Sequence, residues 1–325
     1  MGRFRKSTET VAFSLSCFSN NDLEDIHLAT LEILQQTGVR VESDEAMEIF
    51  EESGASVNRE TKQVKISPCL VEDAIHAAPS SILLAGRNQA HDISIKSGKT
   101  HFTNFGEALM VLDPETGEYR DSTKQDVADI TLVCDALSEV DIVWRPCDAK
   151  DTPPHASSAH EMESIFANTS KHIVHGPGSG ELMKKDIQMG ALVAGGVKEL
   201  KERPVFSSVV CPSSPLTLGK NCCDVIMESA RAGVPCIVLS MTLAGATSPV
   251  TLAGTLIDHN AEVLSGIVLS QLTSRGTPVI YGSSTTIFDL KTATTPVGAP
   301  ELGMISTGVA KLADYYLLPA VVAGG

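Results

Sequence analysis

The sequence PCIVLSMTLAGATSPVTLAGTLIDHNAEVLSGIVLSQLTSRGTPVIYG (residues 235–282) places two short apolar runs on either side of a long segment with helical periodicity. PCIVLS and PVIYG have the length and composition of strands that helices cover in a parallel sheet. Gly and Pro in AGVP (232–235) and RGTP (275–278) are typical of the return from a helix to a strand. The segment therefore predicts a strand–helix–strand unit.

The same alternation extends over most of the chain after residue 100. Helical segments separate seven short runs that predict strands, at 100–105, 141–146, 171–176, 204–210, 235–240, 278–282 and 317–323. Seven strands are one short of the eight that close a (β/α)8 barrel. A doubly wound open sheet is the alternative, but the glycine-rich dinucleotide turn that usually follows its first strand is absent from this sequence. We expect an α/β fold of the TIM (β/α)8-barrel type, incomplete at its C-terminus.

The first part of the chain differs in composition, because it is acidic and combines helical and strand-like patterns. NDLEDIHLATLEILQQTG and SDEAMEIFEESG have helical periodicity and end at Gly38 and Gly54, and VNRETKQVKIS alternates as a hairpin does. These segments carry no recognisable chemical motif. We expect a small N-terminal α+β cap over residues 1–98, and a partial barrel of about seven strands over residues 99–325.

Composition limits the classes of partner. The 325 residues are 42% hydrophobic and carry a formal net charge of −15, which is globular but too acidic for a surface that binds nucleic acid. The sequence has no run near the roughly 20 apolar residues that span a bilayer. Serines interrupt the weakly apolar patch near the N-terminus, which argues against a secretory signal. We expect a cytoplasmic protein that binds neither nucleic acid nor membrane.

Cysteine and histidine spacing gives no metal motif. The eight cysteines include no CxxC pair, so we expect buried free thiols rather than a disulfide framework or a zinc site. His155, His160, Glu161 and Glu163 lack the HExxH spacing, and a solvated helix is the preferred interpretation. We expect no metal ion.

Four polar residues lie near the predicted carboxyl ends of strands and are the candidate catalytic residues. His175 ends a strand and opens HGPGSGE, whose glycines predict a turn with Ser179 capping the next helix. Tyr281 ends the sixth strand, Asp289 lies in the long loop after it, and Glu301 begins the next helix. Long loops at the carboxyl face of a barrel carry active sites. A polar loop residue is the alternative for His175, and a favourable charge at a helix N-terminus is the alternative for Glu301.

Aromatic side chains are few, yet several fall on the same predicted face. Phe105, Trp144 and Tyr281 lie at or near carboxyl ends of strands, and Phe288 lies in a loop on that face. Such rings can surround an alkylammonium group through cation–π contacts, although core packing explains each ring singly. We take Phe105, Trp144 and Phe288 as candidate substrate-binding residues.

The segment AGATSPVTLAGTLIDHNAEVLSGIVLSQLTSRGTPVIYGSSTTIFDLKTATTPVGAPELGMISTGVAKLADYYLLP strongly resembles the trimethylamine methyltransferase family, as do LAGRNQAHDI, LDPETGEYR and SSVVCPSSPLTL. The resemblance covers nearly the whole chain. It implies a TIM-barrel enzyme that passes a methyl group from trimethylamine to the Co(I) corrinoid (cobalamin) of a partner corrinoid protein, with no cofactor bound directly. Under it, Glu301 and Asp289 are candidates to hold a cationic centre or move its proton. A homo-oligomer is also expected.

The resemblance also bears on the last residues, YYLLPAVVAGG (315–325). Family members are longer, and trimethylamine-specific members carry pyrrolysine, encoded by an in-frame amber codon, after a similar strand and turn. We expect pyrrolysine directly after Gly325 and an inactive chain without it. Two alternatives remain open: a glycine betaine or other quaternary-amine:corrinoid methyltransferase, and a non-catalytic truncated protein that only binds or assembles.

Overall fold

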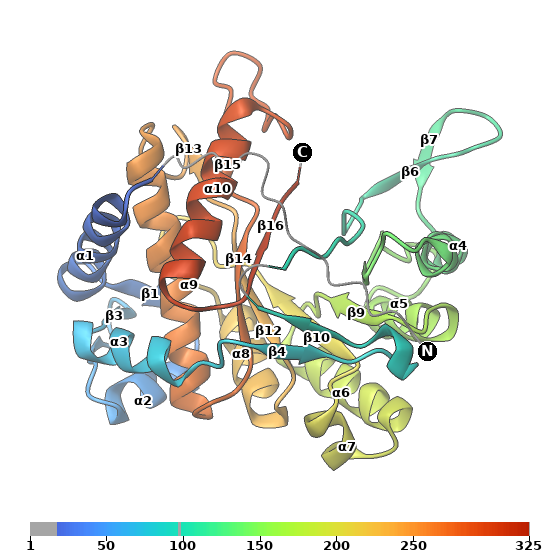
Figure 1. Cartoon of the computed structure of the whole chain (residues 1–325), viewed down its shortest axis with the longest axis horizontal. Coiled ribbons are helices and arrows are strands. Elements are labelled where there is room, and N and C mark those ends of the chain that lie inside the picture. The colour runs from blue at the N-terminus through green and yellow to red at the C-terminus, as the bar shows by residue number, and fades with distance from the viewer. Residues whose placement is uncertain (1–17, 97–98, 325) are drawn as a thin grey trace, which may run out of the picture.

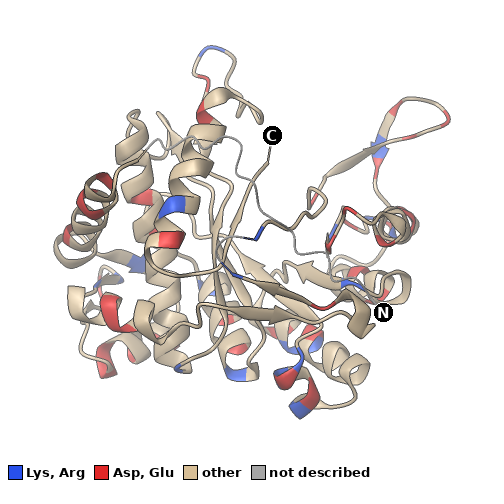
Figure 2. Cartoon of the chain, viewed as in Figure 1, with Lys and Arg blue, Asp and Glu red and all other residues tan. Residues whose placement is uncertain are grey.

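The computed structural model describes residues 18–96 and 99–324. The prediction about a secretory signal concerns residues that lie outside this range, as does Cys17. Within the described residues, no helix is long and apolar enough to cross a membrane. Acidic and basic side chains lie mainly on the helices and loops, and the central strands carry few of them (Figure 2).

A six-stranded parallel sheet forms the centre of the molecule (Figure 1). Its strands neighbour one another in chain order: β8 (Ile142–Trp144), β9 (His172–His175), β10 (Phe206–Val210), β12 (Cys236–Ser240), β14 (Val279–Ser283) and β16 (Ala320–Val322). Each lies within a predicted strand or extends one residue beyond it. The connecting helices are α5 (Ser157–Asn168), α6 (Gly180–Ala194), α7 (Val197–Glu202), α8 (Lys220–Ala232), α9 (Leu252–Thr273) and α10 (Pro300–Tyr315). The predicted α/β class with a parallel sheet is confirmed.

The predicted strand at 100–105 does not form a regular strand. Its only ladder contact is a parallel bridge between Thr103 and Ile142, and the Phe102 carbonyl accepts hydrogen bonds from Asp141 and Ile142 N–H groups. The side chain of Asn104 replaces the next backbone pair: its Oδ1 accepts from Trp144 N at 2.8 Å, and its Nδ2 donates to Trp144 O at 2.9 Å. The segment therefore lies beside β8 through a side-chain amide, which explains why the strand prediction is wrong in detail although its placement is right.

Alternate residues of the strands face two different environments. One face, which carries residues such as Phe206 and Tyr281, packs under the helices in the main hydrophobic core. The other face carries Val174, Val209 and Ile237 and forms a smaller cluster with the β-hairpin of β4 (Ile82–Leu84) and β5 (Ile93–Ile95). The hairpin lies across this second face, hereafter the inner face of the sheet.

The N-terminal region shares a sheet with the rest of the chain. Its helices are α1 (Asn20–Gln36), α2 (Asp44–Glu52) and α3 (Pro68–Ala77), with the 3-10 turn η1 (Gln89–His91) between β4 and β5. Strands β1 (Val39–Val41), β2 (Ser56–Asn58) and β3 (Gln63–Lys65) form a sheet that β11 (Thr217–Leu218) joins in parallel to β1. The predicted hairpin is confirmed, because β2 and β3 pair antiparallel. Ser43 caps α2, since its Oγ accepts from Ala46 N. The domain boundary near residue 98 stays a prediction.

The remaining elements surround one end of the sheet. A hairpin over LDPETGEYR joins β6 (Met110–Leu112) to β7 (Tyr119–Asp121), and it projects from the body beside α4 (Lys124–Ala136) (Figure 1). Two short strands, β13 (Leu243–Ala244) and β15 (Thr286–Ile287), pair in parallel after β12 and β14.

A hydrogen-bond network of hydroxyls, an amide and an imidazole joins the N-terminal region to the helix-covered face of the sheet. Asn260 of α9 donates to the hydroxyls of Thr30 (2.9 Å) and Tyr316 (2.8 Å) and accepts from the Tyr281 hydroxyl (2.7 Å). His27 of α1 reaches the Tyr316 hydroxyl at 3.0 Å. All five side chains are buried. Loss of the central amide would leave several buried hydroxyls without partners, which is costly.

We therefore predict that Asn260→Leu lowers the free energy of unfolding by about 2–4 kcal/mol, because two or three buried polar groups lose their partner. Urea unfolding of the purified protein measures the change. Asn21→Leu, at an exposed position of α1, is the matched control and should change the free energy by less than about 0.5 kcal/mol. Equal stability of the two variants would contradict the structural role of this network.

Candidate functional site

The parallel strands end at one common edge of the sheet. This carboxyl edge consists of the residues that directly follow β8, β9, β10, β12 and β14, and the C-terminal residues of β16 reach it too (Figure 1). Polar loops gather there, as they do at the edge where α/β enzymes bind their substrates. The candidate site lies at the part of this edge formed by β8, β9 and β10.

Glu107 lies at this edge, although no pattern in the sequence indicates it as a candidate site residue. It is a non-glycine residue with φ of +66°, a left-handed conformation that costs about 1–2 kcal/mol. Its N–H donates to Arg145 O at 2.8 Å, and its half-exposed carboxylate lies 3.1 Å from the Arg145 guanidinium. A strained backbone held by a specific ion pair is a feature found often at functional sites.

Two glycines make room for the Glu107 segment. A Cβ atom on Gly176, directly after β9, would lie 2.6 Å from Glu107 Oε1 and 3.2 Å from Val209 on the inner face. A Cβ on Gly106 would lie 2.0 Å from Trp144 Cδ1. The Glu107 carboxylate and the Trp144 indole therefore lie at the carboxyl edge on the inner side of the sheet, where a larger residue at 106 would overlap the indole and one at 176 would displace the Glu107 carboxylate.

A buried ion cluster lies directly behind Glu107. Arg145 contacts Glu161 at 2.6 Å and Asp148 at 3.4 Å, and Glu161 also accepts from Ala149 N and Ser157 Oγ. Burial alone would raise the pKa of Glu161, but the nearby His175 imidazole and Arg145 guanidinium hold that pKa well below its usual range. Glu161 is therefore ionised in this cluster.

His175 occupies the deepest position of the same cluster. Its Nδ1 lies 2.8 Å from Asp186 Oδ2 on α6, and its Nε2 lies 3.7 Å from Glu161 Oε2, an ion-pair distance rather than a hydrogen bond. Burial would lower the His175 pKa, but Asp186 and then Glu161 overcome that effect and raise the pKa to about 9. The expectation that His175 faces the mouth of the barrel is wrong, because the side chain points under α5 and α6 and is fully buried.

The other predicted catalytic residues do not gather around Glu107. Tyr281 is completely buried on the helix-covered face, where it hydrogen-bonds Asn260 and stacks edge-on against His259. Its placement in the core gives it a packing role, in contrast to the catalytic role predicted. Asp289 closes a turn by accepting from Lys291 N at 2.8 Å, and Glu301 lies partly exposed in the first turn of α10. Catalytic roles for Asp289 and Glu301 stay predictions.

The predicted aromatic set is dispersed. Trp144 lies at the site, Phe105 is 71% exposed in the adjacent loop, and Phe288 is half-buried after β15. None of the ring pairs found in the described part of the chain includes any of these three. An aromatic cage built from all three stays a prediction.

The predicted turn after β9 is confirmed, since Ser179 Oγ caps α6 by accepting from Leu182 N. The solvated-helix interpretation of residues 155–163 is wrong at Glu161, which is 2% exposed. Among residues 18–96 and 99–324, no group of three or more His, Cys, Asp or Glu side chains is arranged to hold a metal ion. The described cysteines are free, but Cys69 and Cys211 are exposed rather than buried as expected.

A second buried acid supports the other half of the carboxyl edge. Glu262 of α9 accepts from the hydroxyls of Ser214, Ser240 and Thr242 and from Leu216 N, all at 2.7–3.0 Å. One turn earlier, burial and then the charge of Glu262 raise the pKa of Asp258 to about 6. Neither acid was singled out from the sequence, because each depends on loops distant in the chain.

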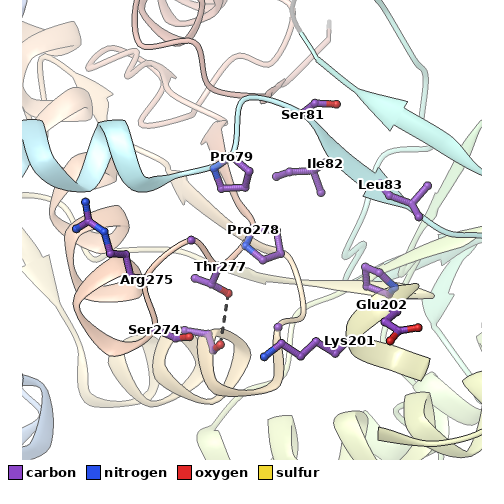
Figure 3. A pocket seen from close by; sticks show the side chains of 14 residues that line it. Pro79, Ser81, Ile82, Leu83, Lys201, Glu202, Ser274, Arg275, Thr277 and Pro278 are labelled. Atoms are coloured by element: carbon purple, nitrogen blue, oxygen red, sulfur yellow. Dashed lines mark hydrogen bonds between the residues drawn. The ribbon is translucent and has the colours of Figure 1, made fainter. Parts of the chain in front are cut away.

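Two cavities lie away from Glu107. One, of about 320 Å³, opens at the amino ends of the strands, where Lys201, Thr277 and Pro278 line it (Figure 3). The other, of about 90 Å³, lies on the inner face, where Trp144 and apolar strand residues line it together with Lys96 and Lys99. The first is at the end opposite to the carboxyl edge, and the two lysine side chains disfavour a cation within the second.

The raised pKa of His175 makes stability depend on pH. A folded-state pKa of about 9, above the ordinary 6.5, contributes stability that is fully present below pH 6.5 and is lost as the pH rises through 9. We predict that the free energy of unfolding falls by about 2–3 kcal/mol between pH 6.5 and 9.5, and that His175→Gln removes most of this fall. Denaturant unfolding across this pH range provides the measurement.

His155→Gln, at an exposed position, is the control and should keep the fall seen in the unmodified protein. Parallel pH curves for the unmodified protein and the His175→Gln variant would show that His175 is not a protonated member of the cluster.

Comparison with known proteins places this chain in a family. The family model described as trimethylamine methyltransferase (MTTB) matches residues 5–325. The chain is 55% identical over 313 residues to trimethylamine methyltransferase MttB of Desulfitobacterium hafniense, covering 96% of this chain and 63% of that protein. It is 47% identical to the Methanosarcina thermophila MttB, covering 95% and 65%, and 29% identical to a glycine betaine methyltransferase of Desulfitobacterium hafniense, covering 94% and 64%.

Solved structures agree at the level of the fold. The monomethylamine methyltransferase MtmB of Methanosarcina barkeri superposes with a TM-score of 0.57 at 13% identity, covering 92% of this chain and 66% of that one. A hydroxylamine complex of MtmB gives a TM-score of 0.59 with the same coverage. The chain spans less than two thirds of the length of the MttB relatives that it matches. The match over nearly all of its residues shows that the chain belongs to the trimethylamine methyltransferase family.

Proposed function

We propose that the protein containing this chain transfers a methyl group from trimethylamine to the Co(I) corrinoid of a partner corrinoid protein. The observation that carries the proposal is the 55% identity to a trimethylamine methyltransferase over 96% of the chain. The glycine betaine methyltransferase is far less similar, at 29% identity, so that substrate is the second candidate. A cytoplasmic location, a homo-oligomeric state and activation of the amine by pyrrolysine stay predictions.

The finer fold proposal is an incomplete TIM-type barrel. A doubly wound sheet reverses its strand order at a switch point, whereas the six strands here follow the chain order without reversal. Thr103 pairs in parallel with Ile142, which continues the same order by one position before β8. These features support a barrel in which the candidate site lies at the catalytic face.

The chemistry of the proposed reaction explains the need for a cation site. Transfer of the methyl group to the corrinoid breaks the C–N bond and leaves its electron pair on nitrogen, so the nitrogen must carry positive charge to leave. A protonated trimethylamine then leaves as neutral dimethylamine and keeps its proton. The corrinoid supplies the nucleophile, and the chain must bind and orient the methylated ammonium group.

The residues at the carboxyl edge fit this task. The half-exposed Glu107 carboxylate offers the opposite charge, and the nearby Trp144 indole offers a ring face for the N-methyl groups. Gly106 lies against the indole and Gly176 lies beside the carboxylate, so neither position adds a side chain there. We therefore assign Glu107 and Trp144 as the ammonium-binding pair of the proposed enzyme.

We predict that Glu107→Gln raises the KM for trimethylamine about tenfold or more, because loss of a charge-assisted contact costs about 1.5–3 kcal/mol. The assay follows cobalt methylation of the corrinoid partner by the full-length protein, with trimethylamine and glycine betaine as separate substrates. Glu115→Gln, on the exposed tip of the β6–β7 hairpin, is the matched control and should keep the KM.

Turnover of glycine betaine in preference to trimethylamine would contradict the substrate assignment and favour the second candidate. An unchanged KM in Glu107→Gln, with trimethylamine as the better substrate, would leave the reaction in place but refute the ammonium-binding role of Glu107.

A further inference from the structure

Arg145 is the group on which the position of Glu107 depends. It follows β8 directly and is only 12% exposed at its side chain, although it contacts three carboxylates: Glu107 at 3.1 Å, Asp148 at 3.4 Å and Glu161 at 2.6 Å. Different nitrogens serve different partners, since Nη2 faces Glu107 and Nη1 faces Glu161 and Asp148. The planar guanidinium therefore connects the exposed acid at the edge to the buried acid behind it.

Arg145 holds Glu107 at two points. Its backbone carbonyl accepts the Glu107 N–H at 2.8 Å, and its guanidinium pairs with the Glu107 carboxylate. These two contacts fix both the left-handed backbone and the direction of the side chain. Without them, the backbone strain at φ +66° would favour a different conformation of the segment.

The layer behind Arg145 is itself immobilised. Glu161 Oε1 accepts from Ala149 N at 2.9 Å and from Ser157 Oγ at 2.8 Å, while its Oε2 faces Arg145 and His175. His175 is held in turn by Asp186 at 2.8 Å. A continuous series of buried polar contacts thus extends from α6 and α5 to the carboxyl edge.

The charge balance of the cluster favours a cation at its exposed end. Its members are the carboxylates of Glu107, Asp148, Glu161 and Asp186, the Arg145 guanidinium, and the His175 imidazole. Even with His175 protonated, the acids outnumber the cationic groups by two. Glu107 is the acid of this set that is most exposed, at 41% of its side chain, so the excess negative charge is offered to solvent at that point.

We propose that Arg145 is a positioning residue, which holds the Glu107 carboxylate beside Gly176 at the carboxyl edge so that the site selects a methylated ammonium group. This inference rests on the proposed function, since it names the residue that sets the geometry of the ammonium site. A cluster with a purely structural role would stabilise the fold but would not change substrate affinity separately from the amount of folded protein.

The test combines Arg145→Lys, Glu107→Gln and the double variant in the full-length protein, with the corrinoid partner as methyl acceptor. Lysine keeps the positive charge but lacks the planar set of N–H donors of a guanidinium, so it cannot hold Glu107 and Glu161 at the same time. We expect Arg145→Lys to raise the KM for trimethylamine about tenfold with little change in kcat. The double variant should have the KM of Glu107→Gln alone, because both changes remove the same contact.

Arg203→Lys is the matched control, since Arg203 forms a bidentate pair with Asp92 away from the carboxyl edge. It should leave the KM unchanged. KM effects that multiply in the double variant, or an Arg145→Lys variant with lower kcat and an unchanged KM, would overturn the positioning role.

A second measurement needs no turnover. Trp144 is the single tryptophan of these 325 residues, and Gly106 lies against its indole. Subtracting the emission of a Trp144→Phe variant isolates its fluorescence. Acrylamide quenching of that signal should increase in Arg145→Lys, because the strained backbone at Glu107, next to Gly106, loses one of its two restraints. Increased quenching in Arg145→Lys, in a protein that does not use trimethylamine, would refute the proposed function but support the positioning role of Arg145. Unchanged quenching in Arg145→Lys would refute the positioning role.

Discussion

The parallel pairing of six strands in unbroken chain order is the constraint from which the rest of the structure follows. It brings every strand's carboxyl end to one edge and buries the four central strands on both faces, while the edge strands β8 and β16 are only partly covered. Within each strand, successive residues alternate between the face under the helices and the inner face. Residues that follow the strands belong to neither face, so they can present polar groups at the carboxyl edge.

This constraint also explains what the sequence could predict. Apolar runs bounded by Gly and Pro located the six strands, because strands covered on both faces are mostly apolar on each of them. Because both faces are mostly apolar, these strands lack the alternation of polar and apolar residues that would show which face a residue occupies. Tyr281 and His175 could therefore be placed near strand ends from sequence, but their burial under the helices could not.

The residues that shape the candidate site depend on contacts that no local pattern encodes. Glu107 acquires its position from a left-handed backbone and from Arg145, 38 positions later in the chain. Asn104 completes the neighbouring ladder with its side chain, so a correct placement was predicted with the wrong backbone structure. A glutamate with positive φ has no sequence signature, unlike a glycine in the same conformation.

The distribution of buried polar groups separates stability from function. Where the N-terminal region docks on the sheet, the network around Asn260 consists mainly of neutral hydroxyls and an amide, which satisfy one another at little desolvation cost. Buried charges are more expensive, and an apolar replacement of similar volume is often at least as stable. Yet the Arg145 and Glu262 clusters both lie behind the carboxyl edge. These two clusters thus place fixed charge where it can orient a ligand, which argues that they serve the site rather than the fold.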